Sequence, residues 1–144
     1  MKRVVVDESF WEVFPDAEIA IMYVDGIDNH DTDENKAERA ELLKQATAES
    51  AKFTKEETFR DNPVVAQWRE AYAKFPKRKG ARASIEALLK RASQGHVFEP
   101  IEPLVDVYNS ISLRYGVPVG IEDRDKIAGD MHLGKAKGGE NFQP

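Results

Sequence analysis

Hydrophobic and polar positions in the first part of the chain predict two short strands and two helices. A β-branched run predicts a strand over residues 3–6, and Asp7 is the expected N-cap of a brief helix over residues 8–13. An apolar run predicts a mostly buried strand over residues 17–24. A long polar helix is expected over residues 33–59. Its thin apolar stripe is typical of a helix that lies on the surface of a domain; the stripe consists of Leu42, Leu43, Ala46 and Phe53.

The second part of the chain has three apolar stripes at helical spacing. The first begins after Pro63, with Asn62 as its expected N-cap, and contains Val65, Trp68, Tyr72 and Phe75. The second predicts a helix over residues 85–93 that Ser84 caps and Gly95 ends, with its face formed by Ile85, Leu88, Leu89 and Ala92. The third predicts a helix over residues 104–115, and its expected apolar face is Leu104, Val107, Tyr108, Ile111 and Tyr115.

A short helix over residues 124–128 and a strand over residues 131–136 complete the expected elements. The order strand, helix, strand, several helices and a last strand predicts an α+β fold in which helices pack on mixed sheets. A length of 144 residues is typical of one domain, so a single domain over residues 1–144 is expected.

Composition narrows the possible chemistry. The chain has no cysteine, which excludes disulfides, thiolate metal sites and a cysteine nucleophile. His30, His96 and His132 lie far apart in the sequence, so no metal site and no cofactor is expected. No apolar run reaches the roughly 20 residues of a membrane span, and the N-terminus has no signal-peptide core, so a cytoplasmic protein without a membrane partner is expected.

Charge is distributed unevenly along the chain. The whole chain carries a net charge of -5, but residues 69–95 contain eight basic and two acidic side chains, a net of +6. Such a segment can attract phosphate groups locally, although lysine and arginine also commonly solvate helix faces. The candidates for contact with phosphate groups are Lys77, Arg78, Lys79, Arg82 and Arg91.

Polar residues interrupt the helix expected over residues 104–115. Asp106 and Asn109 lie three residues apart on one side of that helix, and Ser112 follows. These residues can either line a pocket or bond to nearby backbone, because buried polar groups need partners. Glu122 lies in the loop after Pro118, and Glu140 follows two glycines. A carboxylate there can recognise a polar group or position a water, and Asp123 can also cap the helix that follows.

From Trp68 onward, an ordered set of short motifs resembles the editing domain (B3/B4 type) of the phenylalanyl-tRNA synthetase beta chain and its free-standing relatives. The matching pieces include Phe75-Pro76-Lys77, residues 83–91, Pro103-Leu-Val-Asp-Val-Tyr-Asn109, Pro118-Val-Gly-Ile-Glu-Asp123 and Gly139-Glu140. The resemblance implies a similar fold, a tRNA or aminoacyl-tRNA partner and hydrolysis of a mischarged aminoacyl ester. It implies catalytic roles for Glu140 and Asn109, and substrate contacts from Asp106, Asn109, Ser112, Glu122 and Glu140.

Two departures from the family pattern suggest an alternative. Gly120 stands where the synthetase domain has a histidine, and the chain stops soon after the Gly139-Glu140 motif, before the further strands of the relatives. We therefore expect a domain that is incomplete at its C-terminus and lacks those strands. The alternative function is a non-catalytic module that binds a free amino acid or a related small molecule.

Overall fold

The structure is a computed structural model that describes residues 2–76 and 80–141. The chain consists of two compact units, one of residues Ile27–Ile121 and one of residues Met1–Gly26 with Glu122–Pro144. The expectation of a single domain over residues 1–144 stays a prediction.

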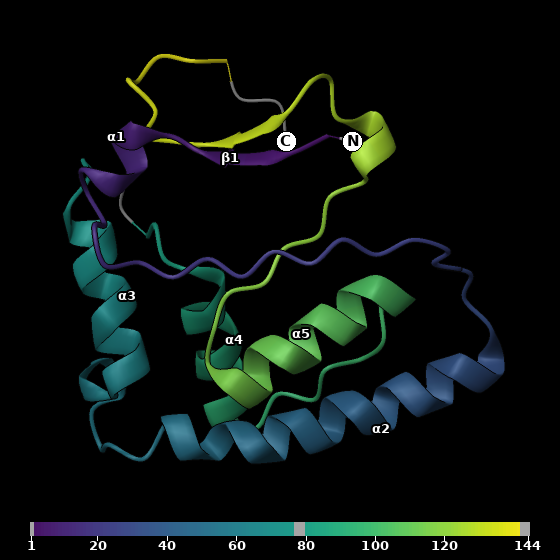
Figure 1. The fold of residues 1–144 in the computed structure, drawn as a ribbon. Helices are drawn as coiled ribbons and strands as arrows, with labels where there is room; N and C mark the ends of the chain where they lie inside the picture. The colour runs from purple at the N-terminus through teal and green to yellow at the C-terminus, as the bar shows by residue number, and fades with distance from the viewer. Residues whose placement is uncertain (1, 77–79, 142–144) are drawn as a thin grey trace. The chain divides into compact units, whose positions relative to one another are not determined.

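The larger unit is helical (Figure 1). Its described residues form four α-helices, α2 (Asp33–Ser50), α3 (Pro63–Ala73), α4 (Ser84–Ser93) and α5 (Pro103–Tyr115), with the short 3-10 turns η1 (Ala51–Phe53) and η2 (Phe59–Asp61). Helix α2 runs along α5, and α4 packs against α5. The buried core of this unit consists of Ala46, Val65, Ala83, Ile85, Leu89 and Leu113.

Helix α2 is shorter than the sequence predicts. It begins after Thr32, whose hydroxyl accepts from the Asn35 N–H while the Asn35 side chain accepts from the Thr32 N–H, a reciprocal capping box. The α-helix ends at Ser50, and the chain tightens into η1. There the Phe53 side chain packs against the core. Leu43 and Ala46 of the predicted stripe are buried.

Helices α3 and α4 confirm the predicted stripes. The predicted N-cap of α3 is confirmed in position, and that of α4 is wrong by one residue. In α3 the stripe holds as far as Tyr72, whereas Phe75 lies beyond the helix end and is exposed. Asn62 occupies the N-cap position, but its side chain accepts from the Glu56 N–H at 3.0 Å and donates to the Phe59 carbonyl instead. Ser84 is the first residue of α4, and Ala83 occupies the N-cap position.

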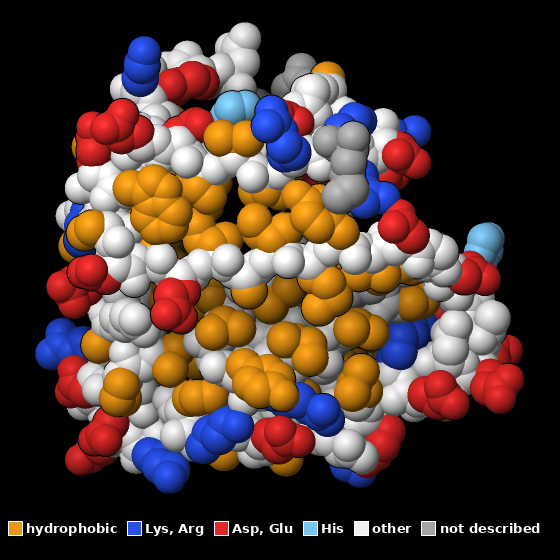
Figure 2. Space-filling view, in the orientation of Figure 1, with side chains coloured by type: hydrophobic (Ala, Val, Ile, Leu, Met, Phe, Trp, Pro, Cys, Tyr) orange, Lys and Arg blue, Asp and Glu red, His pale blue; other side chains and the backbone are white. Residues whose placement is uncertain are grey.

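Helix α5 buries part of the side that was expected to be polar and exposes part of the side that was expected to be apolar, whereas Leu104 and Tyr108 of the expected apolar face are partly buried. Its buried residues are Asp106, Ser110, Ser112 and Leu113. Val107 is 45% exposed and Tyr115 is 66% exposed, and Figure 2 shows hydrophobic side chains open to solvent over α5. The reversal is possible because the buried polar groups have partners: Asp106 pairs with Arg39 of α2, and the Ser110 hydroxyl donates to the Val107 carbonyl.

The smaller unit contains a two-stranded parallel sheet of β1 (Val4–Val6) and β2 (Met131–Leu133), with Val5 opposite His132. The short helix α1 (Glu8–Trp11) follows β1, and the 3-10 turn η3 (Arg124–Lys126) precedes β2. Asp7 occupies the N-cap position of α1 without capping it. Its carboxylate instead contacts Nδ1 of His132 at 2.8 Å. Asp123 caps η3 by accepting from the Asp125 N–H, which confirms that alternative for Asp123.

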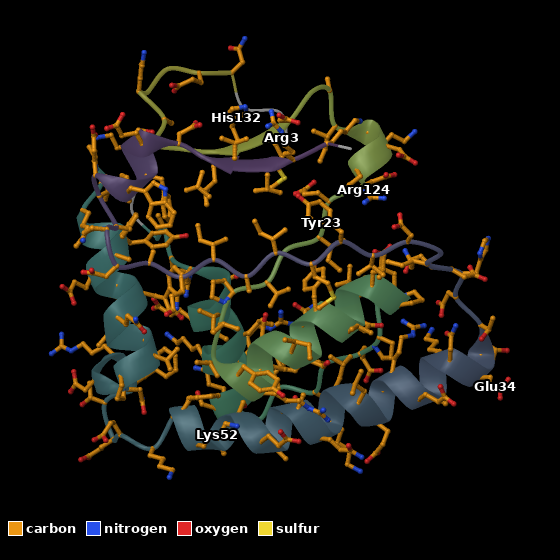
Figure 3. The ribbon with its side chains drawn as sticks, viewed as in Figure 1. Arg3, Tyr23, Glu34, Lys52, Arg124 and His132 are labelled. Carbon is orange, nitrogen blue, oxygen red and sulfur yellow. The ribbon has the colours of Figure 1, made fainter. Side chains whose placement is uncertain are left out.

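The predicted strand over residues 17–24 is wrong. This segment forms no ladder with any strand that the structure describes, and the apolar side chains of residues 21–24 are exposed, with Met22 84% exposed. It is tied to its unit by side chains instead. The Tyr23 hydroxyl accepts from the Val4 N–H at 3.2 Å, and the Arg124 guanidinium lies 5.7 Å from the centre of the Tyr23 ring (Figure 3).

These elements confirm an α+β fold that is rich in helix. The mixed sheets of the prediction are reduced to one parallel pair among the described residues. Similarity of this fold to the synthetase editing domain, and the lack of C-terminal strands, stay predictions. No helix in the described ranges is both long enough and apolar enough to cross a membrane.

Candidate functional site

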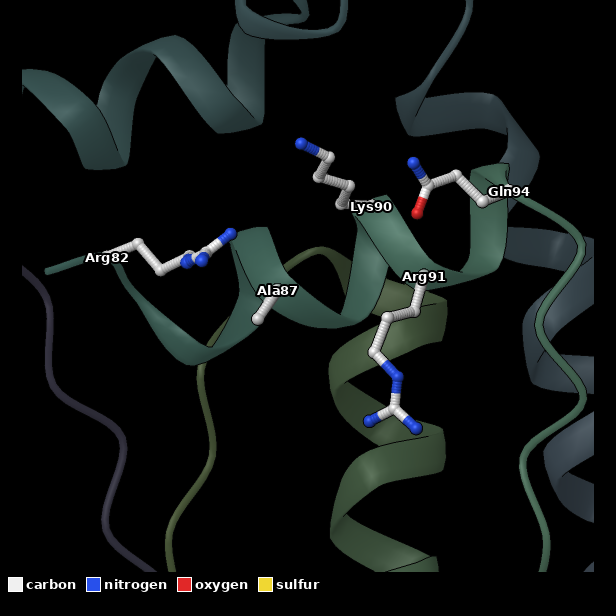
Figure 4. A pocket seen from close by; sticks show the side chains of 5 residues that line it. All are labelled: Arg82, Ala87, Lys90, Arg91 and Gln94. Carbon is white, nitrogen blue, oxygen red and sulfur yellow. The ribbon is translucent and has the colours of Figure 1, made fainter. Parts of the chain in front are cut away.

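A cavity of about 370 Å³ lies on α4 and is bordered mainly by basic side chains. Figure 4 shows the five residues that line it: Arg82, Ala87, Lys90, Arg91 and Gln94. Ala87, Lys90 and Arg91 belong to α4, and Gln94 is its C-cap residue. Ala87 lies about one helical turn before Lys90 and Arg91, and Gln94 lies about one turn after them. Arg82 enters from the segment just before α4. Lys90 and Arg91 leave the helix in different directions.

The charge of this cavity is uncompensated. None of the five lining residues carries a carboxylate. Arg82 and Lys90 form no ion pair with any residue in the described ranges, and both side chains are exposed. By contrast, Arg69, which belongs to the same basic segment, donates twice to the buried Glu86 carboxylate. The cations around the cavity are therefore available to an external anion.

The structure brings together two of the five predicted phosphate contacts, Arg82 and Arg91. The other three, Lys77, Arg78 and Lys79, lie outside the described residues. The structure also adds Lys90 and Gln94, which the sequence analysis did not select. Gln94 lies three residues after Arg91, and this helical spacing was a usable signal, but glutamine at that spacing is also typical of a solvated helix face. Lys90 directly precedes Arg91, so helical spacing does not connect the two residues.

Asp106 lies in a buried ionic network. Its carboxylate is 1% exposed and pairs with the Arg39 guanidinium, which is itself 6% exposed and also pairs with Asp31. Asp106 additionally accepts from the Ile101 N–H at 2.9 Å. These contacts join α2, α5 and the segment before α5. They favour a structural role for Asp106, and its predicted contact with a substrate stays a prediction.

The remaining predicted site residues are divided between the two units. Asn109, which is partly buried, and Ser112, which is buried, belong to α5 of the larger unit. Glu122 and Glu140 belong to the smaller unit, where both are exposed. The catalytic and substrate-binding roles of these residues stay predictions.

Glu140 closes a turn. Its carboxylate accepts from the backbone N–H groups of Lys137 at 2.6 Å and Gly138 at 2.8 Å. The N–H of Glu140 itself, together with those of Lys137 and Gly138, lowers the pKa of Glu140 from its usual value. A carboxylate held in its ionised form in this way is a weak proton acceptor. No group of three or more candidate metal ligands occurs within the described ranges.

Comparison with known proteins places this site in a family. The sequence profile of the B3/4 domain matches residues 67–144, more than half of the chain. The chain belongs to the B3/4 domain family. This B3/4 chain is also 32% identical over 63 residues to the phenylalanine--tRNA ligase beta subunit of Neisseria meningitidis serogroup B (strain ATCC BAA-335 / MC58).

That match covers 44% of the B3/4 chain but only 8% of the ligase subunit. The chain thus spans a small part of the length of this curated relative. No solved structure matches the chain. The family match begins at Gln67 and includes the whole of α4 and its basic cavity.

Proposed function

We propose that this chain is a tRNA-binding module and that the basic cavity on α4 contacts the phosphate backbone. The observation that carries the proposal is the group of three cations, Arg82, Lys90 and Arg91, around a cavity without a carboxylate. A chain with a net charge of -5 repels a polyanion over most of its surface, so binding requires a local basic site of this kind. The relationship to a phenylalanine--tRNA ligase subunit supports tRNA as the polyanion.

The charges of the cavity also favour a phosphate over a free amino acid. A zwitterionic amino acid presents an ammonium group as well as a carboxylate, and its ammonium needs an acceptor of negative charge. The lining residues offer three cations and the neutral amide of Gln94. The side-chain chemistry therefore suits an anion and leaves the ammonium group of an amino acid unpaired.

The proposal also includes an enzymatic activity, the hydrolysis of a mischarged aminoacyl ester. It requires Asn109 and Glu140 to act on one substrate, and these residues belong to different units. A deacylation assay with tyrosine-charged phenylalanine tRNA tests the point. Activity that is lost in Asn109→Ala and in Glu140→Gln would support editing, and the absence of activity in the wild-type chain would exclude it.

The binding proposal is tested with fluorescently labelled tRNA and fluorescence anisotropy. The variant Arg82→Gln/Lys90→Gln removes two cations from the cavity, and we expect its affinity to fall about tenfold at low salt, since each phosphate contact releases counterions. The matched control Lys36→Gln/Lys55→Gln removes the same charge from exposed positions outside the cavity. Equal loss in both variants, or no binding by the wild-type chain, would refute the proposal.

A further inference from the structure

The chain reverses direction after the C-terminal end of α4, and His96 lies beside Arg91 as a result. Gly95 adopts φ +76°, a left-handed conformation that side chains disfavour, just beyond the last helical turn. The His96 N–H then donates to the Arg91 carbonyl, and the Gly95 N–H donates to the Ala92 carbonyl, both at 3.0 Å. This pair of bonds is the Schellman motif. It fixes the chain direction so that the next residues lie beside the last turn of α4.

Two aromatic rings hold the Arg91 guanidinium at this position. The central carbon of the guanidinium lies 5.0 Å from the centre of the Phe98 ring. One terminal nitrogen lies 2.5 Å from Nε2 of His96, which must accept because arginine has only donors. The His96 and Phe98 rings meet edge to face at 4.9 Å. Phe98 in turn packs against the buried core, so the guanidinium is supported by the body of the unit.

The contacts of Arg91 with Phe98 and His96 are not needed for a basic residue to stabilise a helix terminus. A basic residue in the last turn stabilises a helix through the macrodipole, and lysine serves that purpose as well as arginine. At Arg91 the planar group lies against one ring and contacts another, which limits the orientations that it can take. Arg91 remains exposed while it lies beside Phe98. An oriented, exposed guanidinium plane is a surface on which a nucleic-acid base can stack.

We infer that Arg91, positioned by Phe98 and His96, is a stacking site for an unpaired RNA base. Arg82 and Lys90 of the same cavity then contact the adjoining phosphates. The inference rests on the proposed function and specifies it further. A base inside a duplex has both faces covered by its neighbours and cannot reach this plane. The site therefore selects single-stranded segments of an RNA over its paired segments.

The test compares three RNAs: a short single-stranded oligoribonucleotide, the same strand with abasic nucleotides, and the same strand paired with its complement. We expect the wild-type chain to bind the single strand about fivefold or more tighter than the abasic strand, the effect of stacking one base. Arg91→Lys keeps the charge but removes the plane, so it should bind the abasic strand as the wild-type chain does. Its preference for the strand with bases should disappear.

The variant Arg60→Lys serves as the matched control, since Arg60 is exposed on η2 and does not line the cavity. It should retain the full preference. A second variant, Phe98→Leu, removes the supporting ring and should reduce the preference while circular dichroism shows the helices intact. Equal wild-type affinity for all three RNAs, or a preference that survives in Arg91→Lys, would overturn the inference. Failure to bind any of the three would overturn the proposed function as well.

Discussion

At the scale of single residues, the placement of Asp106 explains the unusual packing of α5. A buried carboxylate is tolerated only when charge and hydrogen bonds compensate for lost hydration, and Arg39 and the Ile101 N–H supply both. The small Ser110, one turn further along α5, bonds to its own helix backbone, so its buried hydroxyl is not left unpaired. The polar side of α5 is thereby its contact surface with α2.

The variant Asp106→Asn should strongly destabilise the larger unit. It leaves the Arg39 guanidinium buried without its main counter-charge, and breaking such a pair costs about 3 kcal/mol or more. Urea denaturation followed by circular dichroism measures the change in the free energy of unfolding. The control Glu38→Gln removes a carboxylate from an exposed position on α2 and should have little effect. A similar stability in both variants would show that the pair contributes nothing.

The sequence indicated that Asp106 needs a partner but could not identify it. Arg39 is 67 positions away, and a pattern of neighbouring residues carries no information about such a contact. The predicted apolar face of α5 failed for the same reason, since periodicity assumes that the apolar side faces the core. On α4 the assumption holds, and Ile85 and Leu89 are buried as predicted. Lys90 was missed because its role depends on Arg82, which only the fold brings beside it.

At the scale of elements, helix ends depend on two glycines with different surroundings. Gly95 ends α4 at φ +76° in open space, whereas Gly116 ends α5 at φ +68° with the Phe53 ring only 3.1 Å from the place of a Cβ atom. A side chain at either position incurs the cost of the left-handed backbone. At Gly116 it also displaces Phe53 or Val64.

The pair Gly95→Ala and Gly116→Ala separates these two costs. Gly95→Ala should destabilise the chain by about 1 kcal/mol, the backbone cost alone. Gly116→Ala should cost clearly more, because the added methyl group also meets packed side chains. Thermal or urea unfolding of the two variants measures the difference. Equal destabilisation would mean that the space around Gly116 adjusts without cost.

The β1–β2 pair of the smaller unit should depend on pH through Asp130. This carboxylate accepts from the Arg3 N–H at 2.9 Å and from the Arg3 guanidinium at 2.8 Å. The backbone bond first, and the side-chain bond second, lower the pKa of Asp130. Because the pKa of Asp130 is lower in the folded state, its ionised carboxylate stabilises the folded unit. This stabilisation is fully present above the ordinary aspartate pKa of about 3.9 and is lost as the pH falls through the pKa of Asp130 in the folded state.

NMR titration of the Asp130 carboxyl carbon should therefore give a midpoint below that of an unstructured aspartate. The amide signals of β1 and β2 should shift over the same acidic range, and Asp130→Asn should abolish that dependence. A midpoint at or above the ordinary value would contradict the contacts with Arg3.

The segment over residues 17–24 shows the limit of prediction at this scale, since its apolar pattern fits a strand but a strand also needs a neighbour to bond with.

At the scale of the whole molecule, the proposed function depends on local charge rather than net charge. The chain is acidic, yet three cations border one cavity in its larger unit without a compensating carboxylate. The basic segment that provides Arg82, Lys90 and Arg91 was visible in the sequence. The cavity was not, because it requires the segment before α4 to bring Arg82 beside the helix. Membership of the B3/4 domain family and the ligase relative make tRNA the partner to test.

The salt dependence of tRNA binding tests this account most directly. The logarithm of the association constant falls linearly with the logarithm of the salt concentration, by about 0.7 to 0.9 for each phosphate contact. We predict that Arg82→Gln/Lys90→Gln lowers the steepness of this line by about 1.5 relative to the wild-type chain. The control Lys36→Gln/Lys55→Gln should leave the line unchanged. Identical slopes for the wild-type chain and the cavity variant would contradict phosphate binding at the cavity on α4.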